Sequence, residues 1–206
     1  GIAAMGKTGK FGWGFSTEPQ PGLNGRRGYQ PRGKVLGGSS SLNAMIYTRG
    51  QREDYDHWAA LGNPGWSFDE VLPYFKRAEN NERGGDAFHG SGGPLNVKDL
   101  PEPSPFSKLF VDAGVAAGFP ANNDFNGPSQ EGVGMYQVTH RNGERHNIAR
   151  AYLHPAMGRP NLQVITSAHT TRILLEGRRA VGVEYHKDGA LHQVRATREV
   201  LLSAGA

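Results

Sequence analysis

Two glycine-rich stretches near the start of the chain contain residue types that could bind a phosphorylated ligand. The first runs from Gly1 to Thr8 and matches the pattern G-x-x-x-x-G-K-[ST], in which backbone amides and a lysine surround a phosphate. That chemistry needs a helix directly after the threonine. Gly9, Gly12 and Gly14 disfavour a helix there, so we interpret the stretch as a surface loop, with a P-loop NTPase as the less favoured alternative.

The second stretch, residues 32–44, combines glycine, serine and asparagine in one segment. Gly37 and Gly38 have no Cβ, so the backbone there can approach a flat or phosphorylated ligand closely. The hydroxyls of the serines that follow and the amide of Asn43 offer short hydrogen-bond donors and acceptors. A ligand-binding loop and a plain glycine-serine turn are equally compatible with these residues alone.

The histidines do not form a recognisable metal site. His140, Glu144 and His146 could be drawn as ligands, but their spacing suits neither one face of a helix nor a known zinc pattern. His57 is expected on the surface of a helix. The chain has no cysteine, which excludes a thiol nucleophile and cysteine-type zinc sites. We therefore predict no metal and assign no catalytic residue.

Four helices are expected among the elements that position these segments. Apolar spacing predicts them at residues 53–61, 67–78, 107–118 and 149–156. The second has the clearest start, because Ser67 is a good N-cap and Glu70 follows three residues later, as in a capping box. Gly118 should end the third helix.

The last fifty residues favour β-structure, with turns between short apolar runs. Over the whole chain, strands are predicted at residues 11–15, 132–139, 162–166, 171–175, 180–185, 191–196 and 200–202. Asn142 and Gly143 form a dipeptide that is typical of a hairpin turn. Residues 79–105 are rich in glycine and proline and are predicted to be a long loop.

Composition places the chain among globular proteins with many turns. Of the 206 residues 36% are apolar, and the 30 glycines and 13 prolines make roughly a fifth of the chain, against an average of about 12%. This excess argues against a helical bundle. The net charge is +4, but no block of five like charges appears, so nucleic acid is not indicated. No apolar run approaches the length of about 18 residues that indicates a membrane span.

Residues 32–43, with the segment Tyr47-Thr-Arg-Gly50 and the acidic and aromatic residues 54–58, resemble the first signature of the glucose-methanol-choline (GMC) oxidoreductases. These are FAD-dependent enzymes that oxidise alcohols. Further segments look like successive blocks of the family in the family's order, at residues 11–19, 65–79, 89–94, 124–134 and 161–206. The sequence is most similar to the branch that contains choline dehydrogenase and the bacterial alcohol dehydrogenase (acceptor).

The resemblance implies an α/β fold of mixed α+β content, with part of a Rossmann-like FAD-binding domain and part of an antiparallel-sheet substrate domain. It assigns residues 1–99 and 159–206 to the FAD-binding domain and residues 100–158 to the substrate-binding domain. The family's G-x-G-x-x-G motif and its catalytic histidine have no counterpart in this sequence. We therefore interpret the chain as an internal segment and expect it to be inactive by itself and to bind FAD weakly.

The family places FAD against the glycine-serine loop and, through its adenine, against the backbone of one later residue. The implied cofactor-binding residues are Val35, Gly38, Ser39, Asn43, Ala44, Met45, Ile46 and Thr170. Ala44 would lie near the reactive flavin N5, and residues 89–94 would form a lid over the cofactor. Some members attach the flavin to a histidine at the position of Leu42, so a leucine there implies non-covalent FAD. A serine is usual where this chain has Asn147.

The implied activity is oxidation of the CH–OH group of an alcohol, with hydride transfer to flavin N5 and reoxidation by an external acceptor. The partners would be a small-molecule alcohol and that acceptor, with no nucleic acid. The expected location is the cytoplasm, with peripheral association with the inner membrane left open. The alternative is a non-catalytic binding or interaction protein of the same fold. The identity of the alcohol and the choice between oxidase and dehydrogenase stay open.

Overall fold

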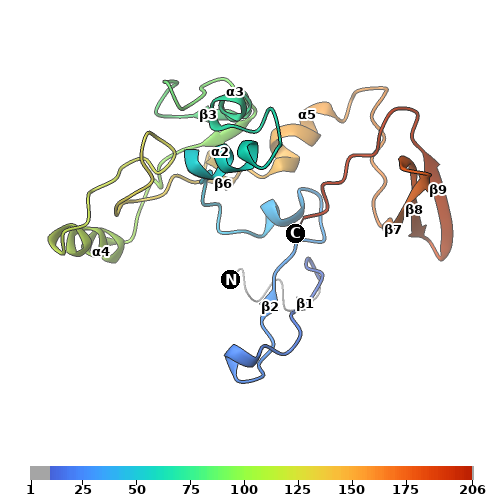
Figure 1. Ribbon diagram of the computed structural model, residues 1–206, viewed down its shortest axis with the longest axis horizontal. Helices are drawn as coiled ribbons and strands as arrows, with labels where there is room; N and C mark the ends of the chain where they lie inside the picture. The colour runs from blue at the N-terminus through green and yellow to red at the C-terminus, as the bar shows by residue number, and fades with distance from the viewer. Residues whose placement is uncertain (1–9, 206) are drawn as a thin grey trace. The chain divides into compact units, whose positions relative to one another are not determined.

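The computed structural model describes residues 10–205, which form two compact units divided between Met157 and Gly158 (Figure 1). The first unit carries the glycine-serine loop and all the helices of the described chain, and the second carries a three-stranded sheet. The division into domains at residues 1–99, 100–158 and 159–206 stays a prediction.

The four predicted helices of the first unit form close to their predicted positions, and two short 3₁₀ helices, η1 (Pro21–Leu23) and η2 (Gly38–Ser41), form where no helix was predicted. The predicted helices are α2 (Arg52–Ala60), α3 (Phe68–Ala78), α4 (Pro105–Ala116) and, at the fourth position, the π-helical η3 (Ala149–Leu153) followed by α5 (His154–Ala156). Helix α3 begins with the predicted capping box, since Glu70 Oε2 accepts hydrogen bonds from Ser67 N at 3.1 Å and Ser67 Oγ at 2.5 Å. Gly118, with φ +96°, follows the end of α4 as predicted.

The first unit contains three pairs of very short strands. Strand β1 (Phe15–Ser16) pairs antiparallel with β2 (Tyr29–Gln30), β3 (Glu79–Asn81) pairs parallel with β4 (Leu95–Val97), and β5 (His140–Arg141) pairs antiparallel with β6 (Glu144–Arg145). Asn142 and Gly143 join β5 to β6 with φ +51° and +79°, so the predicted hairpin turn is confirmed.

Three predictions for the first unit are wrong. The strand at 11–15 is reduced to its last residue, in β1, and the loop at 79–105 contains the parallel pair of β3 and β4. Residues 132–139 form no strand. Their backbone groups bridge separate segments, Val133 to Ala121 and Val138 to both Ile46 and Lys98, so no continuous ladder can form.

The apolar core of the first unit is small and largely aromatic. Tyr55 and Phe68 are buried, and the Tyr55 ring lies 6.1 Å from that of Phe68 and 5.6 Å from that of Phe75. These rings join α2 to α3. Val97 in β4 is fully buried. Many of the other buried residues of this unit are polar, so hydrogen bonding must satisfy much of its interior.

The second unit is an antiparallel meander of β7 (His169–Glu176), β8 (Arg179–Lys187) and β9 (Ala190–Arg195), drawn in orange to red in Figure 1. The strands predicted at 171–175, 180–185 and 191–196 are confirmed. The apolar runs at 162–166 and 200–202 form no strand, because within residues 10–205 neither has a sheet neighbour. A short apolar run alone does not specify a strand.

The mixed helix and strand content predicted from the sequence is confirmed. Among the described residues, no helix is both long and apolar enough to cross a membrane.

Candidate functional site

The glycine-serine loop folds back on itself. Gly33 lies so close to Gly38 that a Cβ on Gly33 would overlap the Gly38 carbonyl group. Gly33 N donates a hydrogen bond to Ser39 Oγ (3.1 Å), and Gly38 N donates to the carbonyl of Val35 (2.9 Å). Gly37 and Gly38 have φ +86° and +54°, in the left-handed region that glycine adopts without steric cost. The paired glycines therefore make the tight turn that begins η2.

Seven of the eight predicted cofactor residues lie on this loop or directly after it. Of these, Ser39, Asn43, Ala44 and Ile46 are exposed, and Val35, Gly38 and Met45 are half-buried. A Cβ at Gly38 would meet no atom within 4 Å, so a ligand can approach the backbone there. Bare backbone, an amide and two exposed apolar side chains, Ala44 and Ile46, together suit a flat ring with a polar edge. The exposed groups of the loop thus fit a flavin.

The eighth predicted cofactor residue, Thr170, belongs to the second unit. It is exposed in β7, where it pairs with Tyr185 of β8. The role of Thr170 at an adenine stays a prediction, as do the roles of the seven loop residues.

A distant segment holds the loop in place. Arg145, in β6, donates from Nη1 to the Ser40 carbonyl (3.1 Å) and to Asn43 Oδ1 (2.7 Å), and from Nη2 to the Asn43 carbonyl (2.8 Å). Asn147 Nδ2 donates to Ser41 Oγ at 2.8 Å. The asparagine that replaces the family's usual serine therefore has a structural partner, because its longer side chain reaches the loop.

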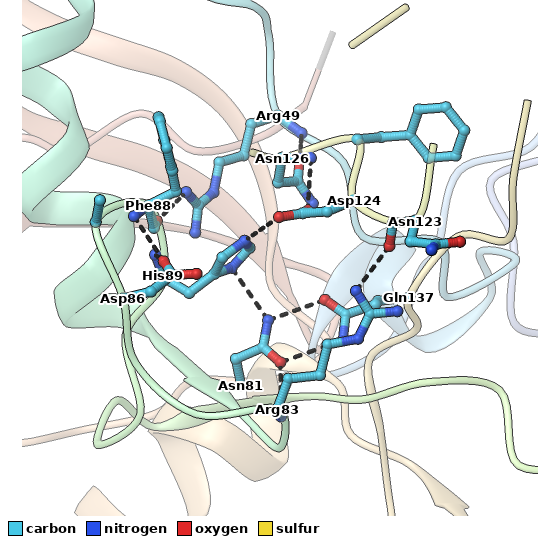
Figure 2. A network of polar contacts seen from close by, with 12 residues as sticks. Arg49, Asn81, Arg83, Asp86, Phe88, His89, Asn123, Asp124, Asn126 and Gln137 are labelled. Carbon is cyan, nitrogen blue, oxygen red and sulfur yellow. Dashed lines mark hydrogen bonds and ion pairs between the residues drawn. The ribbon is translucent and has the colours of Figure 1, made fainter. Parts of the chain in front are cut away.

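A second group of side chains forms a buried polar network, which we define as Arg49, Glu79, Asn81, His89, Asp124, Asn126 and Gln137. Figure 2 labels all of these residues except Glu79. Glu79 is the centre of the network and is fully buried. Its Oε2 lies 2.7 Å from Arg49 Nη2 and accepts a hydrogen bond from Gly90 N at 3.0 Å. Burial alone would raise the pKa of Glu79, but the hydrogen bonds from His89 and Gly90 and the charge of Arg49 outweigh it and lower that pKa.

His89 lies between two carboxylates, with each ring nitrogen facing one of them. Its Nδ1 is 3.0 Å from Glu79 Oε1, and its Nε2 is 2.9 Å from Asp124 Oδ2; Figure 2 shows the second of these contacts. The hydrogen bond to Glu79 raises the pKa of His89, and the contact with Asp124 adds to this against the opposing effect of burial. The imidazolium form therefore satisfies both carboxylates at once.

The amides of the network connect segments that are far apart in the sequence. Asn81 Nδ2 donates to Gln137 Oε1 at 2.9 Å, and Gln137 Nε2 donates back to Asn81 Oδ1 at 3.1 Å. Asn126 Oδ1 accepts from Arg49 N (2.7 Å), and its Nδ2 donates to the Tyr47 carbonyl (3.1 Å). Tyr47 follows directly after Ile46, so the network anchors the downstream end of the predicted flavin loop.

The predicted lid, residues 89–94, is packed against α3 and β3. A Cβ on Gly90 would overlap the carbonyl of Lys76, and one on Gly93 would overlap the backbone of Ala78. Gly93 N also donates to the Glu79 carbonyl at 2.8 Å. The segment thus has close backbone support on the side of α3, while its role as a lid over a cofactor stays a prediction.

Sequence reasoning missed the buried polar network, although Arg49, Glu79, His89, Asp124 and Asn126 fall in segments that resemble the family. The members of the network are scattered between residues 49 and 137 and form no local motif. Glu79, Asn81 and His89 fall in the segment predicted as a long loop, so no local signal marked them as buried.

Two of the three residues weighed as metal ligands have other partners, whereas Nδ1 of the third, His140, is buried without one among the described residues. Glu144 pairs with Arg150, and His146 Nδ1 accepts a hydrogen bond from Asn96 N at 3.1 Å. Burial lowers the pKa of His146, and the charges of Arg141 and Arg150 add to this. In the part of the chain that the structure describes, no cluster of histidine and acidic side chains could hold a metal ion.

A cleft of about 420 Å³ lies beside the start of α2, and its lining includes Arg49, Arg52, Phe68, Phe88 and Gln130. None of the eight predicted cofactor residues lines it. The candidate flavin surface is therefore the exposed loop rather than this cleft.

Both the structure and the sequence of the chain are similar to those of known oxidoreductases. The structure superimposes on an FAD-dependent oxidoreductase from Chaetomium thermophilum with a TM-score of 0.86 and 31% identity, covering 95% of this chain and 37% of that one. The sequence is 48% identical over 209 residues to an alcohol dehydrogenase [acceptor] of Pseudomonas putida, covering all of this chain and 38% of the relative. It is 47% identical over 196 residues to an oxygen-dependent choline dehydrogenase of Brucella anthropi, covering 95% of this chain and 36% of the relative.

These matches define an oxidoreductase fold of which the chain is one part. The family model described as GMC oxidoreductase matches residues 3–206. The chain belongs to the GMC oxidoreductase family, and both the predicted family and the predicted fold class are confirmed. The chain spans less than two fifths of the length of the relatives it matches.

Proposed function

We propose that the protein is an FAD-dependent oxidoreductase that acts on the CH–OH group of a small alcohol, of the alcohol or choline dehydrogenase type. Membership of the GMC family and the names of the relatives support this activity. The observation that carries the proposal is the glycine-serine loop, whose exposed backbone and short side chains fit a flavin in a chain of this family.

The loop residues would hold the flavin by complementary surfaces. Val35, Gly38 and Ser39 would contact one end of it, with Gly38 allowing close approach of the backbone. Asn43 would meet a polar edge, and the residues from Ala44 to Ile46 would cover the ring. FAD, when bound, supplies the two-electron acceptor for the oxidation of the alcohol. This chain's residues contribute orientation of the flavin and exclusion of water from its face.

The flavin would be bound without a covalent link, because the leucine at position 42 has no nucleophilic atom. Precipitation of the FAD-loaded protein with acid tests this directly. Non-covalent flavin should appear in the supernatant, whereas a covalent link would leave the yellow colour with the protein.

Titration with FAD followed by addition of a primary alcohol or choline tests the proposed function. We expect saturable binding, however weak, by this chain. Loss of visible flavin absorbance on adding alcohol without an acceptor is expected only of a protein of the length of its relatives, which carries the catalytic histidine that has no counterpart here. Ala44→Trp should weaken FAD binding at least tenfold, since a large side chain would occupy the flavin face. Ala60→Trp, at the exposed end of α2, is the matched control and should leave binding unchanged. An FAD titration of the purified protein that shows no saturation would overturn the proposal.

The same titration distinguishes the alternative functions. A non-catalytic protein of this fold would bind FAD but would not lose flavin absorbance with any alcohol, even at the length of the relatives. The P-loop NTPase alternative requires ATP binding that is lost in Lys7→Ala; Lys7 and the rest of the P-loop-like stretch lie outside the described residues.

The remaining partners and the location extend the proposal. A small-molecule alcohol and an external electron acceptor would be the partners, with no role for nucleic acid. A cytoplasmic location, with or without peripheral membrane association, is tested by separating the cell extract into soluble and membrane fractions.

A further inference from the structure

Met45 has an unusual backbone for a residue with a side chain. Its φ is +64°, in the left-handed region that costs non-glycine residues free energy. Such a conformation persists only where surrounding contacts fix it. Met45 N donates a hydrogen bond to Asn43 Oδ1 at 3.0 Å, and the Met45 carbonyl accepts from Thr139 N at 2.9 Å. The side chain of Asn43 is thus one of the two supports of this backbone.

Arg145 in turn fixes Asn43. Its guanidinium donates to both the side-chain and the main-chain oxygen of Asn43, at 2.7 and 2.8 Å, and to the Ser40 carbonyl. The amide oxygen of Asn43 therefore receives Arg145 on one side and Met45 N on the other. Two oxygens of one residue held by one planar guanidinium leave that residue little freedom to rotate.

The guanidinium of Arg145 forms hydrogen bonds with this loop and no ion pair with an acidic side chain of the described residues. Among residues 10–205, no carboxylate lies within ion-pair distance of Arg145, and Glu144, its neighbour, pairs with Arg150. The side chain is half-buried, and burial lowers its pKa. Burial has already removed part of the water around this guanidinium, so its hydrogen bonds to the three oxygens of the loop are lost only at a cost in free energy.

We propose that Arg145 is a positioning residue of the flavin site: it fixes Asn43, and through Asn43 the left-handed backbone of Met45, so that residues 43–46 keep the conformation that meets the flavin. This inference rests on the proposed function, in which these residues line the flavin. Arg145 itself need not touch the cofactor. Its effect passes to Met45 through its hydrogen bonds to Asn43 and the hydrogen bond from Met45 N to Asn43 Oδ1.

Amide hydrogen exchange of the FAD-free protein tests the first half of the proposal. Arg145→Met should raise exchange over residues 40–46 by about tenfold, which corresponds to about 1.4 kcal/mol. The exchange rates in Arg145→Lys should lie between those of Arg145→Met and those of the unsubstituted protein, because an ammonium group cannot reproduce the planar guanidinium. Arg141→Met, which removes an exposed arginine from the same hairpin, is the matched control and should leave the loop unchanged. Equal exchange in Arg145→Met and Arg141→Met would overturn the inference.

Visible circular dichroism of the bound flavin tests the second half. At saturating FAD, Arg145→Met should change the shape of the flavin bands and should raise the Kd for FAD by about tenfold, with partial recovery in Arg145→Lys. Bands identical to those of the unsubstituted protein would overturn the positioning role even if affinity fell. Failure of the unsubstituted protein to bind FAD would instead overturn the proposed function, and the exchange measurement would still show whether Arg145 fixes the loop.

A double-mutant cycle shows whether Arg145 acts through Asn43. If it does, Arg145→Met should raise exchange at Met45 little further in an Asn43→Ala background. Additive effects would contradict the proposed relay.

Discussion

The guanidinium of Arg49 lies 2.7 Å from the carboxylate of Glu79, and their side chains are only 3% and 0% exposed. Two opposite charges have been removed from water together, which is costly unless every remaining polar atom is satisfied. Most of them are: Glu79 also accepts from Gly90 N and faces His89, and Arg49 also donates to the Phe88 carbonyl at 2.7 Å. The pair therefore joins the start of β3 to the segment that follows the flavin loop.

Glu79→Gln should destabilise the protein by about 3–5 kcal/mol, because it keeps the shape of the side chain but leaves Arg49 buried without its counter-charge. Urea unfolding measures the effect. The control is Glu18→Gln, which removes an exposed ion pair with Arg27 and should cost less than about 1 kcal/mol. Equal losses in the two variants would show that the Arg49–Glu79 pair contributes no more than a surface pair.

The stability of the protein should fall as the pH rises through the raised pKa of His89. Below the unfolded value of about 6.5 the imidazolium is present in both states, and its full contribution is retained. As the pH rises through the folded pKa the proton is lost, and with it the bonds to Glu79 and Asp124. Arg49 is the positive charge nearby, through its pair with Glu79.

Urea midpoints measured from pH 6 to pH 9 should therefore fall more steeply for the unsubstituted protein than for His89→Asn, since only the former releases this proton. Identical slopes would mean that another group causes the pH dependence.

Gly33→Ala should distort the flavin loop, because the added Cβ would overlap the carbonyl of Gly38. We expect a loss of about 1–3 kcal/mol in unfolding free energy and weaker FAD binding. Gly22→Ala is the control: a Cβ there meets no atom within 4 Å and the backbone needs no positive φ. Calorimetric titration with FAD and thermal unfolding of both variants provide the comparison, and unchanged FAD affinity in Gly33→Ala would argue against the loop as the flavin site.

Gly182→Ala should weaken the three-stranded sheet of the second unit. A Cβ there would overlap the carbonyl of Val194 across the β8–β9 ladder. The amide exchange rates within β7, β8 and β9 should rise, which corresponds to a loss of about 1–3 kcal/mol in the free energy of opening the sheet. Gly158→Ala, where a Cβ meets nothing within 4 Å, should leave these amides protected. The same exchange rates in both variants would contradict the close packing of β8 on β9.

Local signals in the sequence predicted the elements that local interactions specify. Ser67 and Glu70 cap α3, and Asn142 with Gly143 turns the β5–β6 hairpin; both depend on residues within four positions of one another. The meander of β7, β8 and β9 was predictable for the same reason, since tight turns join its strands, whereas the runs at 162–166 and 200–202 did not form the predicted strands.

Elements that depend on distant partners could not be predicted in this way. Strands β3 and β4 contain the polar residues Glu79, Asn81 and Asn96, and the segment between them packs closely on α3. Residues 132–139 were predicted as a strand, but their backbone groups bridge three separate segments and form no continuous ladder. The candidate flavin loop was predicted from its resemblance to the family signature. The residue that positions it, Arg145, lies 102 residues from Asn43, and no nearby sequence pattern marks it.

The long separations within the buried polar network bear on the order of folding. Arg49 bonds to Asn126 across 77 residues, and Asn81 bonds to Gln137 across 56. Bringing such segments together costs chain entropy before any contact repays it. We expect Arg49 and Glu79, which lie 30 residues apart, to keep their water until these segments meet, so that the ion pair forms late in folding. Substitutions at these two residues should accordingly speed unfolding while leaving the folding rate nearly unchanged.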